Sequence, residues 1–209
     1  ALTANTTATG NTASGFYSLK CNTGQNNAAF GNRAALSNTT GINNVAVGSE
    51  SLCSNTTGNQ NTAIGMNAVR KNSTGCNNTG LGYGAGFGLT TGNHNTAIGG
   101  CTMYCGVSSC CNVAVGFAAL VSTCGTCFNT AVGTSALVET TTGSYNTAVG
   151  GSSMGCNTTG NKNVAVGYRV LCLNSTGAQN VAVGTFSLDR NTTGNENTAS
   201  GYAALYCNT

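Results

Sequence analysis

The stretch Asn44-Val45-Ala46-Val47-Gly48 decides the fold, because close copies of it recur along the sequence. From Gly31 to Gly201 the glycine of each copy follows the previous one after seventeen residues, and Gly15 precedes Gly31 by sixteen. A strict short period along a chain indicates one supersecondary unit repeated along an axis. Positions within each repeat are numbered here from this glycine, so that the asparagine lies at −4 and the alanine at −2.

An asparagine occupies position −4 in every repeat. Identical amides stacked along an axis donate to and accept from one another, as in the asparagine ladders of cross-β assemblies. The pattern therefore predicts a buried, satisfied ladder at a turn rather than a row of ligand-binding groups. Its members are Asn11, Asn27, Asn44, Asn61, Asn78, Asn95, Asn112, Asn129, Asn146, Asn163, Asn180 and Asn197.

Each repeat holds two short strand-like runs and two turns. The alternation in Asn-Val-Ala-Val is a strand signal, and the polar Asn-Thr-Thr-Gly stretches supply turn residues. We predict an all-β protein, a parallel β-solenoid (β-roll) of about twelve seventeen-residue coils, forming a single repeat domain over residues 1–209 without capping segments. At roughly 4.8 Å per coil, the rod is about 55–60 Å long.

The alternation leaves two choices for the core. If the valines and isoleucines at −1 pack inward with the leucines at +4, the alanines at −2 face outward. An outward column that stays small favours close docking, so we expect lateral or trimeric packing of another chain on this alanine face. In the alternative, the alanines line a narrow core and the Val/Ile column is exposed, an apolar stripe that also needs cover.

The composition argues against several function classes. Charged residues make up 5% of the chain, against roughly a quarter in ordinary domains. The net charge of +3 includes no basic run, so neither nucleic acid nor an anionic membrane is an expected partner. No apolar stretch approaches the length of a membrane span, and no membrane insertion is expected.

No catalytic constellation is visible in the sequence. The acidic residues Glu50, Glu139, Asp189 and Glu196 lie on separate coils, and His94 is the single histidine. No nucleophile has a base at a motif spacing, and the glycines follow the coil period rather than a phosphate-binding loop. We predict that the protein is not an enzyme and needs no cofactor or metal.

Residues 44–69 and 129–150 carry the repeat most clearly, with Asn-Val-Ala-Val-Gly or Asn-Thr-Ala-Val-Gly and, in the second range, a following Ala136-Leu137. The pattern resembles the YadA-like head domains of trimeric autotransporter adhesins. It is similar also to the Asn-Thr-Ala-x-Gly arrays of some phage and giant-virus fibre and adhesin-like proteins. This resemblance covers nearly the whole chain and implies an elongated, surface-displayed, often trimeric stalk or head.

The twelve cysteines point to an oxidising compartment. Cys110 and Cys127 share position −6 on adjacent coils, which would place their Cα atoms near 4.8 Å apart, within the range of a disulfide. Cys156 and Cys172 form a second candidate pair, at +6 and +5 of adjacent coils. Pairing of the remaining cysteines is left open.

A metal site is the alternative use of the central cysteines. It would combine Cys124 and Cys127 of a single CxxC motif with other nearby ligands. A second CxxC and a second histidine are missing, so disulfides are preferred. The further ligands in this alternative are Cys101, Cys105, Cys110, Cys111 and His94.

Asn-x-Thr sequons recur at one place in the repeat, with Asn5 in the matching N-terminal place and Asn77 off this column. If they are glycosylated, one turn edge of the rod carries a row of sugars; alternatively, Asn-Thr-Thr-Gly is only good turn chemistry. The candidate sites are Asn5, Asn38, Asn55, Asn72, Asn77, Asn157, Asn174 and Asn191.

We expect an extracellular filament subunit, displayed on a cell or virion surface, that assembles head-to-tail with itself through uncapped ends. The end residues concerned are Ala1, Leu2, Leu205, Cys207 and Thr209. One alternative is a fragment of a trimeric adhesin or viral fibre shaft. Another is an ice-binding solenoid with threonine columns at −3 and in the Thr-Thr turns.

Overall fold

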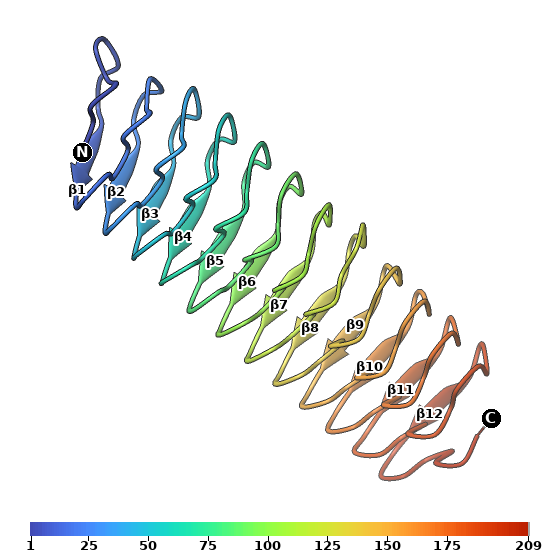
Figure 1. Cartoon of the computed structure of the whole chain (residues 1–209). Coiled ribbons are helices and arrows are strands. Elements are labelled where there is room, and N and C mark those ends of the chain that lie inside the picture. Colours follow the sequence, from blue (N-terminus) through green and yellow to red (C-terminus); the bar gives the residue numbers. More distant parts are fainter. Residues whose placement is uncertain (209) are drawn as a thin grey trace.

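The computed structural model describes residues 1–208 and shows a straight parallel β-solenoid, which confirms the predicted fold (Figure 1). Every coil contributes one three-residue strand, and the strands form a single parallel sheet in chain order. The strands are β1 (Thr12–Ser14), β2 (Ala28–Phe30), β3 (Val45–Val47), β4 (Thr62–Ile64), β5 (Thr79–Leu81), β6 (Thr96–Ile98), β7 (Val113–Val115), β8 (Thr130–Val132), β9 (Thr147–Val149), β10 (Val164–Val166), β11 (Val181–Val183) and β12 (Thr198–Ser200).

The glycine at position 0 ends each strand for a steric reason. Gly48 has φ 126°, a left-handed conformation that side chains rarely adopt. A Cβ added to Gly48 would lie 2.6 Å from the carbonyl oxygen of Gly65, its counterpart on the next coil. The glycine column is therefore required both by the turn and by the close stacking of the coils.

The prediction of a second strand in each coil is wrong. Positions +2 to +6, called here the second face, form consecutive turns in which +2 and +4 are left-handed, as at Glu50 (φ 55°) and Leu52 (φ 50°). A strand cannot contain such alternation. The second face is nevertheless bonded from coil to coil, because the Leu52 amide donates to the Ala68 carbonyl at 2.9 Å.

The alanines at −2, rather than the valines and isoleucines at −1, face the core, which is the reverse of the first expectation. Ala46 at −2 is fully buried, whereas Val47 at −1 is 36% exposed, and this pattern recurs along the sheet. The alanines stay small because the +4 side chains, such as fully buried Leu52, reach across a thin core from the second face. Docking of another chain on the alanine face is therefore excluded, and the alternative assignment of the core is confirmed.

The predicted asparagine ladder at −4 is confirmed, with a bonding pattern richer than side-chain stacking. The Asn27 Oδ1 accepts the main-chain amide of Asn44 at 2.9 Å, and the same bond recurs between successive coils. The Asn44 Nδ2 donates to the carbonyl of Gly58, in the turn that leads into the next coil, at 2.9 Å. Each of these side chains thus bonds both to the start of the next coil's strand and to the turn that precedes that strand.

Candidate interaction surfaces

A second asparagine ladder runs along position +7, which is the sequon column. The Asn55 Nδ2 donates to Asn38 Oδ1 at 2.6 Å and to the Gly58 carbonyl at 2.9 Å, and Asn72 continues the chain of amides. These side chains are fully buried, so a glycan cannot be attached to them in the folded rod. The predicted glycosylation is therefore wrong at Asn38, Asn55, Asn72, Asn157, Asn174 and Asn191.

The other two sequons are not fully buried: Asn5 occupies the +7 place at the N-terminal end, whereas Asn77 lies off the column. Asn77 is exposed, in a left-handed turn with φ 58°. Asn5 is half-buried, and its Nδ2 donates to the Ala8 carbonyl at 3.0 Å. Glycosylation stays a prediction at these two positions.

The +7 ladder is interrupted in the middle of the rod, where four successive coils carry Leu89, Gly106, Thr123 and Thr140. Polar groups at this break lose their partners. The buried side-chain oxygens without a hydrogen bond among residues 1–208 are Asn72 Oδ1, Thr123 Oγ1 and Thr140 Oγ1. The ladder resumes at Asn157 and continues to Asn208.

The interruption begins with an exchange of core side chains in one coil. Gly86 occupies +4, where most other coils carry leucine, valine or methionine. A Cβ on Gly86 would lie 3.1 Å from Leu89 Cδ1, so the leucine at +7 fills the space that Gly86 leaves. Gly80 likewise replaces the alanine at −2, and its missing Cβ makes room for Val69 Cγ2. The core divides here into two apolar clusters, one ending at Val69 and the other starting at Ala85.

Within the interrupted stretch, a covalent link joins adjacent coils. Cys110 and Cys127 form the predicted disulfide, with their Cα atoms 4.8 Å apart. The second predicted pair is not bonded: Cys156 and Cys172 are free thiols, although the Cys156 amide donates to the Cys172 carbonyl at 2.9 Å. Burial raises the pKa of both thiols, which keeps them protonated and unreactive near neutral pH.

The alternative metal site is not assembled. Cys110 and Cys127 are consumed by their mutual bond, while Cys105 and Cys124 are exposed free thiols. Among residues 1–208, no three histidine, cysteine or acidic side chains gather closely enough to hold a metal ion. The part of the chain that the structure describes contains no helix long and apolar enough to cross a bilayer.

Charged side chains are confined to one side of the rod. Apart from Lys162 and Glu196 in the turns, every Asp, Glu, Lys and Arg lies on the second face at +2, +5 or +6. Several pair there along the axis: Glu50 contacts Arg33 at 2.9 Å and Arg70 at 2.8 Å. The second face is therefore a solvated surface on which exposed charges are tolerated.

The outer sheet face, defined as the side chains at −3 and −1 of β1–β12, carries no charge at all. Its −1 column is mostly aliphatic, and several members are well exposed, such as Leu81 (44%) and Val183 (42%). Its −3 column alternates irregularly between threonine and valine, with Ala28 in β2. The face is thus a flat, uncharged stripe that follows the whole rod.

Aromatic side chains at +1, directly after the glycine that ends each strand, border this uncharged stripe. Phe117 and Tyr168 at +1 are 61% and 52% exposed. Each ring lies beside the +1 glycine of the preceding coil, Gly100 or Gly151, within van der Waals distance of where a Cβ would stand. These aromatics extend the uncharged surface beyond the strands.

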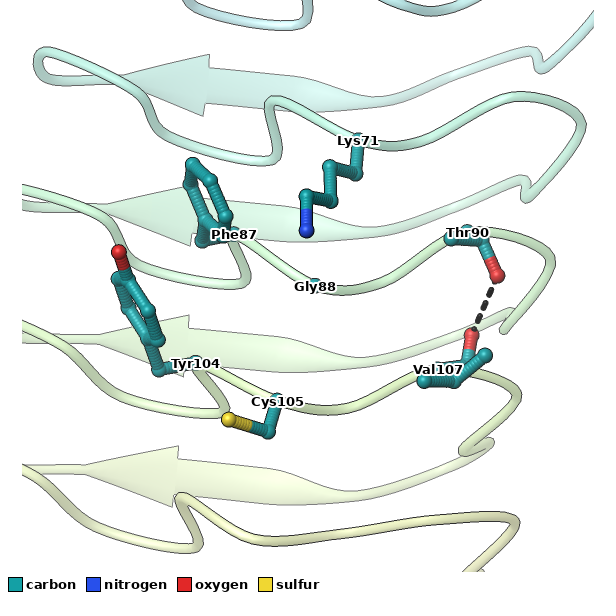
Figure 2. Close-up of a pocket in the computed structure, with 7 residues that line it drawn as sticks. All are labelled: Lys71, Phe87, Gly88, Thr90, Tyr104, Cys105 and Val107. Carbon is teal, nitrogen blue, oxygen red and sulfur yellow. Dashed lines mark hydrogen bonds between the residues drawn. The ribbon is translucent and has the colours of Figure 1, made fainter.

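The second face holds a shallow pocket of about 270 Å³ beside the coil that carries Gly86 (Figure 2). The rings of Phe87 and Tyr104 stack with centroids 4.7 Å apart, and the Lys71 ammonium lies 4.9 Å from the Phe87 centroid. The Thr90 hydroxyl donates to the Val107 carbonyl at 2.9 Å. These groups satisfy one another, so the pocket offers few unpartnered groups for recognition.

The two ends of the sheet present strand edges. Within residues 1–208, β1 pairs only with β2 and β12 only with β11. Leu2 bonds to the coil of Leu19 through the Ser18 carbonyl at 3.2 Å, and Leu205 at the other end is 50% exposed. Ala1 and Cys207 are exposed, and Thr209 lies outside the described residues.

Comparison with known protein families, with curated proteins and with solved structures finds no match to this chain. The resemblance to YadA-like heads and fibre repeats therefore stays a prediction.

Proposed function

We propose that the chain is a non-enzymatic structural subunit of an extracellular or virion-surface filament, in which copies stack end to end along the solenoid axis. The supporting observation is that the axial bonds are the same from coil to coil. The Thr62 amide at −3 donates to the Asn78 carbonyl of the next coil at 2.8 Å. The Gly82 amide of that next coil donates in turn to the Ile64 carbonyl, also at 2.8 Å. One side of any coil is therefore complementary to the opposite side of any other.

The edge of β12 carries the matching groups for a second copy. The Thr198 amide and the Ser200 carbonyl have no partner among residues 1–208. In the internal pattern, these groups bond to the carbonyl at −4 and the amide of the glycine, which in β1 of another copy are Asn11 and Gly15. Unpaired strand edges of this kind template the addition of another chain.

Such stacking makes one demand on the second face. Residues 1–6 lie one coil before Leu19, so joining β12 to β1 of the next copy brings them to the level already held by residues 204–208. One of the two segments must move aside. No side chain in either segment is fully buried, so this displacement disturbs little of the core.

The disulfide is consistent with an oxidising, extracellular setting. An array of identical columns also suits mechanical continuity better than catalysis, which requires unlike groups to converge on one point. The acidic residues Glu139 and Asp189 lie fifty positions apart, roughly three coils along the rod, and so do not converge.

The test removes the donor at the strand edge. Thr198→Pro deletes the amide that would bond to the next copy, while the Val181 amide can still donate to Asn197. Thr198→Val is the matched control, because valine occupies −3 in β3, β7, β10 and β11. Electron microscopy should show long uniform fibres for the parent and for Thr198→Val, and short rods only about 55–60 Å long for Thr198→Pro.

Two results would contradict the proposal: dispersed rods of the parent at high concentration, or fibres of unchanged length from folded Thr198→Pro. Short rods with three-fold symmetry would instead favour the trimeric adhesin or fibre-shaft alternative.

A further inference from the structure

We propose that the outer sheet face of one rod packs against the same face of a second copy, so that rods associate laterally as well as end to end. The proposal goes beyond axial stacking and does not depend on it. It rests on the distribution of charge, the exposure of apolar columns, the size of the face and its spacing.

The absence of charge is specific to this face rather than a result of the low overall charge. The second face carries exposed lysines, arginines and glutamates in many coils, which shows that the fold accepts them on an open surface. The −3 and −1 positions are also open, with Val181 and Val183 at 40% and 42% exposure. Yet all twelve strands keep these positions uncharged. Depletion of charge is typical of the centre of an interface.

The apolar side chains form one continuous patch. The −1 column runs from Phe30 through Leu81 to Val183, and the aromatic rings at +1 lie alongside it. Soluble monomers rarely expose continuous apolar patches of more than a few hundred square ångströms. Such a stripe therefore needs cover.

The face is large enough for a stable pair. Twelve strands at roughly 4.8 Å give a length of about 55 Å, and three residues give a width of about 10 Å, hence roughly 550 Å² of flat surface on each copy. The bordering aromatic side chains add to this area. Two such faces approach the roughly 1,200–2,000 Å² of total surface that specific interfaces bury.

The spacing of the columns identifies the partner as a second copy. Adjacent coils are 4.8 Å apart at the Cys110–Cys127 link, and every column repeats at this interval. Only a surface with the same repeat can fit side chains between side chains along the whole rod, as paired sheets do in dry steric-zipper interfaces. Two identical faces meet through a two-fold axis, the commonest symmetry of protein assemblies.

The test places charge at the centre of the face. Val115→Lys/Val132→Lys puts two lysines in the −1 column of β7 and β8. The matched control, Val121→Lys/Val138→Lys, makes the same change on the same two coils at +5 of the second face, where Lys20 and Arg70 occur naturally. Molar mass from light scattering and rod width from electron microscopy are measured for the parent and both variants, with circular dichroism as the check on folding.

We expect the parent and the control to have double-width rods, and Val115→Lys/Val132→Lys to have single-width rods of at most half the mass per length. Fibre length should change only in Thr198→Pro, so lateral and axial contacts fail separately. Single-width parent rods at all concentrations would overturn the proposal, as would double-width rods in the Val115→Lys/Val132→Lys variant. Single-width parent rods with thermal hysteresis that is lost in that variant would assign the face to ice instead.

Discussion

The coils at residues 38–72 and those at residues 106–140 have the same backbone conformation. However, different interactions hold adjacent coils together in the two regions. In the first region, each +7 asparagine donates to the preceding asparagine of the column and to a turn carbonyl. In the second region, that column holds Gly106, Thr123 and Thr140, both threonine hydroxyls are unpartnered, and a disulfide links adjacent coils. The comparison indicates that the −4 ladder and the alanine column specify the coil, whereas +7 supplies replaceable axial reinforcement.

The largest effect is expected where the +7 ladder is intact. Asn55→Ala removes two donated bonds and one accepted bond, and leaves the buried Asn38 Oδ1 without its partner. Because an orphaned buried acceptor bears its full desolvation cost, the free energy of unfolding should fall by about 2–3 kcal/mol. Urea denaturation of the variant and parent measures the change.

Thr140→Val is the matched control in the same column. The Thr140 hydroxyl is fully buried and unpartnered, so replacing it by a methyl group of similar size removes an unsatisfied group. The expected change is below about 1 kcal/mol, in the direction of greater stability. A loss as large as that of Asn55→Ala would mean that the two regions do not differ in the proposed way.

A smaller effect is expected at the boundary between the regions, as a coupling between Gly86 and Leu89. Gly86→Leu alone crowds Leu89, whose Cδ1 lies 3.1 Å from the added Cβ, and Leu89→Asn alone leaves a void beside Gly86. The double variant restores the pattern of the regular coils. The loss of unfolding free energy in the double variant should be smaller than the sum of the losses in the two single variants, by about 1–2 kcal/mol.

A double-mutant cycle in urea measures this coupling. Additive costs would show that Leu89 does not fill the space at Gly86, and the exchange of core side chains would then be the wrong explanation of the boundary.

The sequence predicted the fold well because the repeat is strict. The seventeen-residue period, the glycine turn, the −4 ladder and the Cys110–Cys127 bond all follow from stacking equal positions on one another. The direction of the pleat did not follow, because Ala at −2 and Val at −1 alternate equally well in either orientation. Only the length of the +4 side chains across a thin core decides that Ala46 faces inward.

The surfaces were harder to predict. For the +7 asparagines the sequence leaves glycosylation and turn chemistry open, because the same Asn-Thr-Thr-Gly letters describe a sequon and a turn. Their regular spacing and the glycine three residues later were the signal for a ladder, as Asn55 and Gly58 show. The charge-free outer face can also be predicted from the residues at −3 and −1, but only once the orientation of the strands is known. The left-handed residues at +2 and +4, such as Val69 with φ 47°, had no local signal.

Native-state hydrogen exchange tests the contrast between the two regions most directly. The Leu52 and Leu120 amides occupy the same +4 position, and both donate to the next coil at 2.9 Å, to Ala68 and Ala136 respectively. When the Cys110–Cys127 bond is reduced, we predict that the Leu120 amide exchanges much faster while Leu52 is unchanged. Equal acceleration at both amides, or no change at Leu120, would contradict the claim that the disulfide replaces the missing asparagines.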